Sequence, residues 1–108
     1  MASKPNEEII EIIKRLIKEI SKNNIKIEKA FLFGSHAKGT ATEWSDIDVA
    51  LVSDDFIGIR FYDNIELAKY KLKIDNRLET HPYRASEFNV DSRWFVQEIL
   101  DNGIEIEV

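Results

Sequence analysis

The stretch Phe31–Val52, FLFGSHAKGTATEWSDIDVALV, decides the fold of this chain. It begins with an apolar run that stops at Gly34-Ser35 and ends with a second apolar run that starts with the acids Asp46 and Asp48. Short apolar runs bounded by polar turn residues are typical of buried strands. The stretch therefore predicts two strands, joined by a short helix or tight turn and a loop.

The two acids at the start of the second run predict a metal site. Residues i and i+2 of a strand project from the same face, so Asp46 and Asp48 should point the same way and away from Ile47. Two like charges on a half-buried sheet are costly unless a positive charge lies between them. A divalent cation with oxygen ligands would supply that charge. The alternative is a solvated strand end that carries two ordinary acids.

Gly34-Ser35 is a candidate phosphate-binding turn. Glycine lets a ligand approach the backbone closely, and the N-terminus of a following helix carries partial positive charge. Lys38 follows one turn later and could neutralise a triphosphate. The alternatives are a plain turn with an N-cap serine and a solvated surface lysine.

Hydrophobic periodicity divides the rest of the chain into helices and strands. We expect helices over 5–22, 57–73 and 92–101, a short helix or turn over 35–41, and strands over 25–33, 46–53, 76–81 and 104–108. This order predicts an α/β (α+β) fold, in which helices pack on one sheet.

Three details of these elements can be tested. The helix over 57–73 should bury the stripe Phe61, Ile65, Ala68 and Leu72. Pro82 should end the third strand, because proline cannot donate to a central ladder. Pro5 and Asp91 suit the first positions of their helices.

The third predicted strand offers a further acid. Arg77, Glu79 and His81 alternate onto one face, so Glu79 would complete a carboxylate cluster if this strand lies beside the second one. Asp75 is a rival third acid, although it falls in the predicted turn. The two histidines have no partner at a zinc-like spacing.

Composition limits the possible partners. The 108 residues suit a single domain, 1–108, and the net charge of −5 makes nucleic acid an unlikely partner. The chain has no cysteine, which excludes disulfides and thiolate metal sites and fits a cytoplasmic protein. The apolar runs are too short to span a membrane.

The combination of Gly34-Ser35 with Asp46-Ile47-Asp48 on a strand resembles the signature of the DNA polymerase β-like nucleotidyltransferase superfamily. The fuller strings 33–39 and 45–48 are most similar to the minimal nucleotidyltransferases of prokaryotes. These are small single-domain proteins, often paired with a HEPN-family partner as antitoxin and toxin. The resemblance implies the nucleotidyltransferase fold, a mixed central sheet of three to four strands flanked by helices.

The resemblance also implies an activity and its residues. Family members bind a nucleoside triphosphate and two magnesium ions, and transfer a nucleoside monophosphate to an acceptor hydroxyl. By position, the nucleotide would be held by Gly34, Ser35, Lys38 and Ser45. The catalytic carboxylates and metal ligands would be Asp46, Asp48 and Glu79, with glutamate in place of the more usual aspartate at the third position.

The resemblance implies AMP transfer from ATP, with a tyrosine of a HEPN-type helical partner as the acceptor. The alternative is an antitoxin or regulatory subunit that acts by contact with a helical partner and has a slow or vestigial site. Either function could involve a homo- or hetero-oligomer, in which a partner chain supplies the surface that larger relatives take from a second domain.

Overall fold

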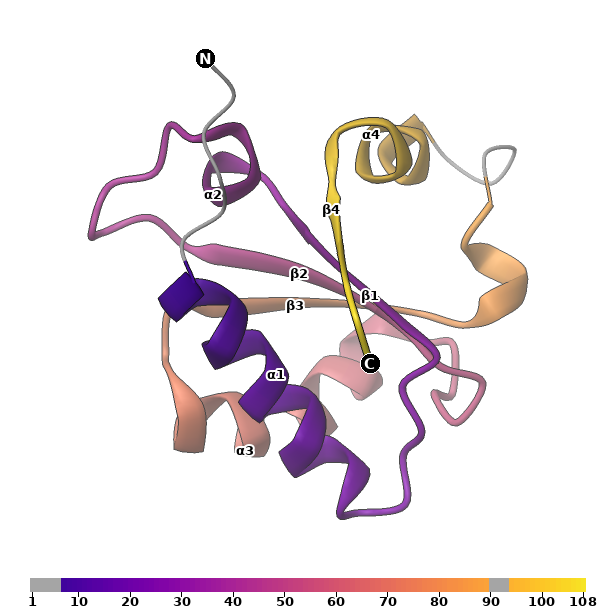
Figure 1. Cartoon of the computed structure of the whole chain (residues 1–108). Coiled ribbons are helices and arrows are strands. Elements are labelled where there is room, and N and C mark those ends of the chain that lie inside the picture. The colour runs from indigo at the N-terminus through magenta and orange to yellow at the C-terminus, as the bar shows by residue number, and fades with distance from the viewer. Residues whose placement is uncertain (1–6, 90–93) are drawn as a thin grey trace.

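The computed structural model describes residues 7–89 and 94–108, which form one four-stranded sheet with helices on both faces (Figure 1). The elements, in chain order, are α1 (Glu7–Ser21), β1 (Lys29–Phe33), α2 (Ser35–Lys38), β2 (Ile47–Val52), α3 (Arg60–Ile74), β3 (Leu78–Tyr83), the 3-10 helix η1 (Ala85–Glu87), α4 (Trp94–Asn102) and β4 (Ile104–Ile106). The strand order is β3-β2-β1-β4; β2 and β3 are parallel, and the other two pairs are antiparallel. This mixed sheet confirms the predicted fold class.

The two faces of the sheet carry different layers. Helices α1 and α3 cover one face and α4 lies over the other (Figure 1). Because side chains alternate along a strand, Ile47, Val49 and Leu51 are fully buried in the core under α1 and α3. Asp48 and Ala50 therefore face the α4 side, as the strand pattern predicted.

Pro82 lies inside β3, so the prediction that it ends the strand was wrong. β3 is at the edge of the sheet and pairs with β2 alone, through residues Leu78–Tyr83. A proline on an edge strand leaves the ladder intact when its missing N–H would face away from the neighbouring strand. The inner strand β1 begins at Lys29 and not at residue 25.

Helix α3 also corrects the sequence reasoning. The stripe predicted to be buried is exposed, with Phe61 at 68%, Ile65 at 57% and Leu72 at 69%. The helix instead turns Asp63, Leu67 and Tyr70 inward. Asp63 tolerates burial because its carboxylate accepts two backbone hydrogen bonds of 2.9 Å from the loop before the helix.

The proposed helix caps Pro5 and Asp91 lie outside the described residues. Within the described parts of the chain, no helix is both long enough and apolar enough to cross a membrane.

Candidate active site

The turn after β1 is shaped by its contact with Asp48. Gly34 has φ 74° and ψ −151°, a conformation that L side chains rarely adopt, and its carbonyl accepts the N–H groups of Ala37 and Lys38 at 3.1 Å. A Cβ at this position would collide with Oδ2 of Asp48. The glycine therefore lets the first turn of α2 lie directly against this carboxylate.

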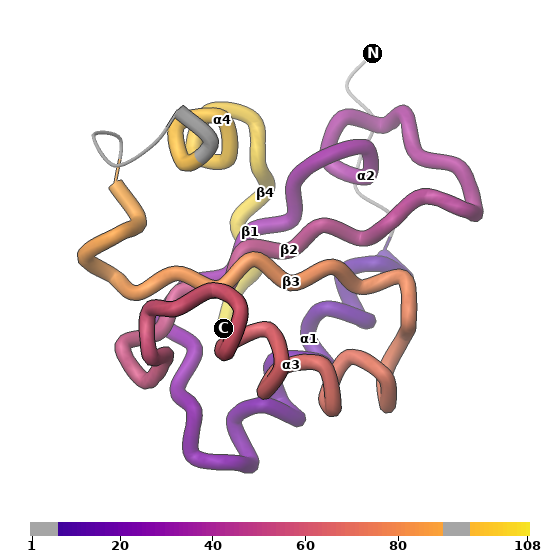
Figure 2. The backbone as a smooth tube through the Cα atoms, turned by 180° about the vertical axis from the view of Figure 1, so that it is seen from behind, coloured from indigo at the N-terminus to yellow at the C-terminus, as the bar shows by residue number. Residues whose placement is uncertain are grey.

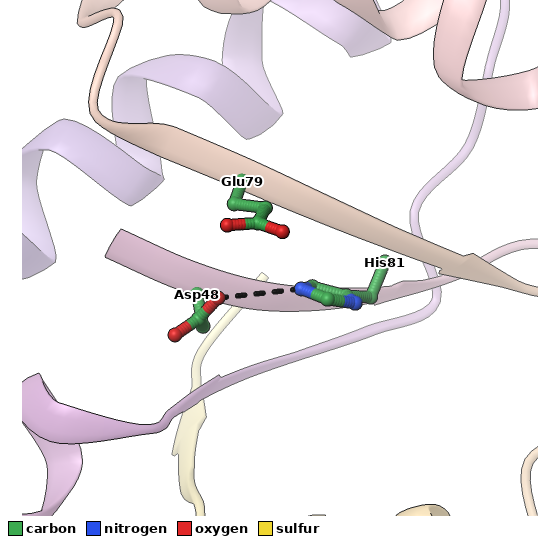
Figure 3. A group of neighbouring side chains, drawn as sticks. All are labelled: Asp48, Glu79 and His81. Atoms are coloured by element: carbon green, nitrogen blue, oxygen red, sulfur yellow. Dashed lines mark hydrogen bonds and ion pairs between the residues drawn. The ribbon is translucent and has the colours of Figure 1, made fainter. Parts of the chain in front are cut away.

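The strand register brings the acids to one end of the sheet. Antiparallel pairing places Phe33 opposite Asp48, and parallel pairing places Asp48 beside Glu79. The ligand atoms of Asp48, Glu79 and His81 lie within 4.8 Å of one another (Figure 3). Asp46 immediately precedes β2, and its carboxylate lies close enough to Glu79 to accept a hydrogen bond from the protonated Glu79 carboxyl.

The pKa of Glu79 is raised by its burial and by the neighbouring acids. Desolvation raises the pKa of Glu79 above its usual value, and the hydrogen bond to Asp46 and the charge of Asp48 raise it further, against a smaller opposite effect of His81. Burial therefore accounts for the largest part of the shift, and the neighbouring acids Asp46 and Asp48 account for the rest. Clustered carboxylate oxygens of this kind fit a hard divalent cation such as magnesium.

His81 is a member of the site that the sequence reasoning missed. Arg60 donates from Nη2 to Nδ1 of His81 at 3.0 Å, so the proton of a neutral ring lies on Nε2, which faces Oδ1 of Asp48 at 3.4 Å. The ring of Phe33 packs against the imidazole with centroids 4.9 Å apart. The signal was present in the sequence, because His81 alternates with Glu79 on the same strand face.

Two hollows flank His81. The first, of about 440 Å³, lies between α2, the sheet and α4, and is lined by Phe33, Gly34, Lys38, Asp48, His81, Glu98 and Asn102. The second, of about 380 Å³, lies on the α3 side and is lined by Arg60, Asn64, Glu79, Thr80 and His81. Nζ of Lys38 pairs with Oε1 of Glu98 across the first hollow at 3.8 Å, so Lys38 does reach the site.

Other predicted residues have different neighbours. Ser35 is the first residue of α2, next to Gly34, and its carbonyl accepts the N–H of Thr40. The hydroxyl of Ser45 accepts the N–H of Thr42 at 2.9 Å within its own loop. The carboxylate of the rival acid Asp75 accepts hydrogen bonds from Arg77, which lower its pKa.

Comparison with known families agrees with this geometry. Residues 15–107 match the family model described as "Polymerase beta, Nucleotidyltransferase". A Methanocaldococcus jannaschii protein named "Putative protein adenylyltransferase" is 31% identical over 102 residues, which cover 92% of this chain and 99% of the relative. A second protein of that name from the same organism is 36% identical over 85 residues, covering 77% and 81%.

Solved structures show the same fold. A toxin–antitoxin complex with AMP-PNP aligns with a TM-score of 0.63 at 23% identity, covering 91% of this chain and 72% of the other. The MntA–HpeT toxin–antitoxin aligns with a TM-score of 0.58 at 23% identity, covering 92% and 72%. A nucleotidyltransferase from Sulfolobus solfataricus aligns with a TM-score of 0.58 at 20% identity, covering 74% and 70%.

The fold is that of the nucleotidyltransferases of the polymerase β type. On the family match, which extends over most of its length, the chain belongs to the polymerase β nucleotidyltransferase family.

Proposed function

We propose that this protein is a magnesium-dependent nucleotidyltransferase that transfers AMP from ATP to a hydroxyl group of a partner protein. The observation that carries the proposal is the convergence of Asp46, Asp48 and Glu79 beside the Gly34 turn. Membership of the family supports a transferase activity. The donor, the metal and the acceptor are proposals.

The carboxylates of Asp46, Asp48 and Glu79 would hold two magnesium ions. The raised pKa of Glu79 supports this assignment, because a carboxylate cluster that lacks compensation gains most from bound cations. Bound magnesium would neutralise the charge of the triphosphate and of the reacting phosphoryl group. The His81 ring, held by Arg60, would fix the orientation of Asp48.

The hollow between α2 and α4 would receive the nucleotide. The backbone at Gly34 and Ser35 and the ammonium of Lys38 would contact the triphosphate. The acceptor oxygen then attacks the α-phosphorus and forms a P–O bond, while the bond to the bridging oxygen breaks. Pyrophosphate leaves and the hydroxyl proton is released, so no protein nucleophile is needed.

The acceptor would be a tyrosine hydroxyl of a helical, HEPN-type toxin partner. Two observations support a protein acceptor. The relatives carry the name protein adenylyltransferase, and two solved structures of the same fold are toxin–antitoxin complexes, one of them with AMP-PNP.

Label transfer tests this proposal. The chain is incubated with ATP labelled at the α-phosphate, magnesium and the protein encoded by the adjacent reading frame. We expect label in that protein together with released pyrophosphate, and a loss of at least about 100-fold in the Asp46→Asn/Asp48→Asn variant.

A matched control removes one charge nearby without touching the cluster. Glu43 is exposed in the loop before Asp46, so Glu43→Gln should retain full transfer. Label transfer that persists in the double Asn variant, or a wild-type protein that labels nothing with magnesium present, would contradict the proposed activity.

A function by contact alone is the second candidate, and the exposed apolar face of α3 favours it. In that case, the double Asn variant would bind and neutralise the partner as well as the wild type does. Neutralisation of the partner in cells by the double variant therefore separates the two functions.

A further inference from the structure

We infer that Arg60 controls which metal the candidate active site accepts, because it fixes the proton of the His81 ring on Nε2. Ligand atoms of Asp48, Glu79 and His81 lie close enough together to hold one ion. A ring nitrogen that carries a proton is a hydrogen-bond donor and offers no lone pair to a metal. The inference deepens the proposed function and rests on it for the presence of a metal at this site.

Arg60 is held in position by two contacts with the edge strand β3. Arg60 is the first residue of α3, and Figure 2 shows that this helix lies beside β3. Its Nη2 lies 3.0 Å from Nδ1 of His81, and its guanidinium lies over the ring of Tyr83, 5.7 Å from the ring centroid. His81 and Tyr83 are two residues apart and therefore share one face of the strand. The guanidinium thus packs on one side chain of that face while it binds the other.

The chemistry of the guanidinium decides the direction of its hydrogen bond to His81. Arginine has only N–H donors and does not lose its proton in proteins. Nδ1 of His81 must therefore supply the lone pair, and a ring protonated on both nitrogens would lose this bond. The proton of the ring lies on Nε2, which faces Oδ1 of Asp48 at 3.4 Å. His81 is consequently a donor to Asp48 and not a metal ligand through this nitrogen.

The imidazole of His81 is also held against rotation. Its side chain is only 15% exposed, and the ring of Phe33 packs edge-on against it with centroids 4.9 Å apart. A half-turn of the ring would place carbon atoms where the two nitrogens now lie, and would lose the contacts with both Arg60 and Asp48. Figure 3 shows the ring directed at Asp48, with Glu79 beside them. The position of the proton therefore determines what the ring offers to the site.

The state of His81 determines the set of metal ligands. Carboxylate oxygens suit hard cations such as magnesium and manganese, whereas an imidazole nitrogen suits zinc, copper and nickel. With Nε2 protonated, the site presents the carboxylates of Asp48 and Glu79 without a nitrogen ligand. Arg60 is therefore a positioning residue that acts through His81 and favours magnesium over zinc.

Nitrogen-15 NMR of the histidine rings measures the position of the proton directly. The signals that disappear in His81→Asn belong to His81. We expect the wild type, without metal, to carry the proton on Nε2, and Arg60→Ala to move it at least partly to Nδ1, since the donor to Nδ1 is then gone. A wild-type His81 ring with its proton on Nδ1 would overturn the inference.

Metal titration of Arg60→Ala tests the consequence for selectivity. Once Nδ1 carries the proton, Nε2 can bind an ion that Asp48 and Glu79 also hold. We expect the ratio of zinc affinity to magnesium affinity to rise at least about tenfold. Competition with a fluorescent zinc indicator measures the first affinity, and calorimetry with magnesium chloride measures the second. Arg60 is exposed, so the variant should unfold within a few degrees of the wild type.

A double variant separates the nitrogen ligand from the effect of charge. Loss of the positive charge of Arg60 strengthens the binding of every divalent cation to nearby carboxylates. Arg60→Ala/His81→Asn keeps this charge effect and removes the ring, so its ratio of zinc to magnesium affinity should return to that of His81→Asn. Equal gains for zinc and magnesium in Arg60→Ala, or a raised ratio that persists in the double variant, would overturn the inference.

Failure of this inference can be told apart from failure of the proposed function. AMP transfer by the wild type with magnesium, together with an unchanged affinity ratio in Arg60→Ala, would refute the role of Arg60 and retain the activity. A gain in zinc selectivity that requires His81, in a protein whose wild type transfers no AMP, would refute the activity and retain the role of Arg60.

Discussion

At the level of a single residue, the backbone conformation of Gly34 allows the turn after β1 to lie against the carboxylate of Asp48. Its φ of 74° and the closeness of the Asp48 carboxylate exclude a side chain. We predict that Gly34→Ala reduces AMP transfer at least about 100-fold, because the new methyl group displaces the carboxylate of Asp48, which we propose to be a metal ligand. The measurement is label transfer per folded molecule, with the folded fraction taken from urea unfolding.

Gly39 provides the control for this prediction. It also has a positive φ, 78°, in the left-handed region. Gly39→Ala should lower the free energy of unfolding by about 1 kcal/mol and leave transfer per folded molecule unchanged. Equal transfer by the two alanine variants would show that the approach of Gly34 to Asp48 is irrelevant to activity.

Glu79 makes the stability of the metal-free protein depend on pH. Its raised pKa means that the folded state binds this proton more tightly than the unfolded state does. Stability therefore falls as pH rises from the ordinary glutamate pKa through the raised value. We predict that Glu79→Gln, which cannot ionise, raises the Tm at pH 8 in EDTA by on the order of 1–3 °C.

Measurements over a range of pH also test whether ionisation of Glu79 causes this Tm difference. At pH 3.5 the Tm difference between Glu79→Gln and the wild type should be much smaller, because most of the Glu79 carboxyl is then protonated. Magnesium at pH 8 should stabilise the wild type more than the variant. Glu105→Gln, which alters an exposed acid on β4, should have no such effect. A Tm gain that is constant with pH would show that ionisation of Glu79 is not its cause.

At the level of an element, the sequence pattern of α3 does not predict which face of this helix is buried. Two faces compete for burial: Phe61 and Ile65 lie on one, and Leu67 and Tyr70 lie on the other. The face with Phe61 is the more apolar, whereas Asp63 gives the opposite face the pattern of a solvent-exposed surface. Apolar periodicity does not show the contact that decides between the two faces, because N–H groups of the preceding loop satisfy Asp63 and thereby allow its burial.

Asp63 should therefore be essential for the position of α3. Asp63→Ala leaves the N–H groups of Ile57 and Gly58 without their charged acceptor, and we predict a loss of about 1–3 kcal/mol in the free energy of unfolding. Asp63→Asn keeps one acceptor oxygen and should lose less. Urea unfolding checks both values, and an alanine variant as stable as the wild type would contradict this explanation of the helix.

For the whole molecule, the sequence predicts the order of helices and strands and the fold class, because apolar periodicity and turn residues are local signals. It also predicts that Gly34, Asp46, Asp48 and Glu79 belong to one site, and these residues lie close together in the structure. It does not identify His81 or the second hollow, since these depend on parallel pairing of β2 with β3 and on Arg60 reaching across from α3. Pro82 misleads for the same reason, because its effect depends on β3 being an edge strand.

The register of the sheet brings together the end of β1, the start of β2 and strand β3. We propose that the site formed there binds magnesium together with a nucleoside triphosphate. Calorimetric titration with AMP-PNP measures this binding. The wild type should bind the analogue at least tenfold more tightly with magnesium than with EDTA, and the Asp46→Asn/Asp48→Asn variant should show no such difference. Equal affinity of the wild type in magnesium and EDTA, or an undiminished magnesium effect in the double variant, would contradict the assignment of the site.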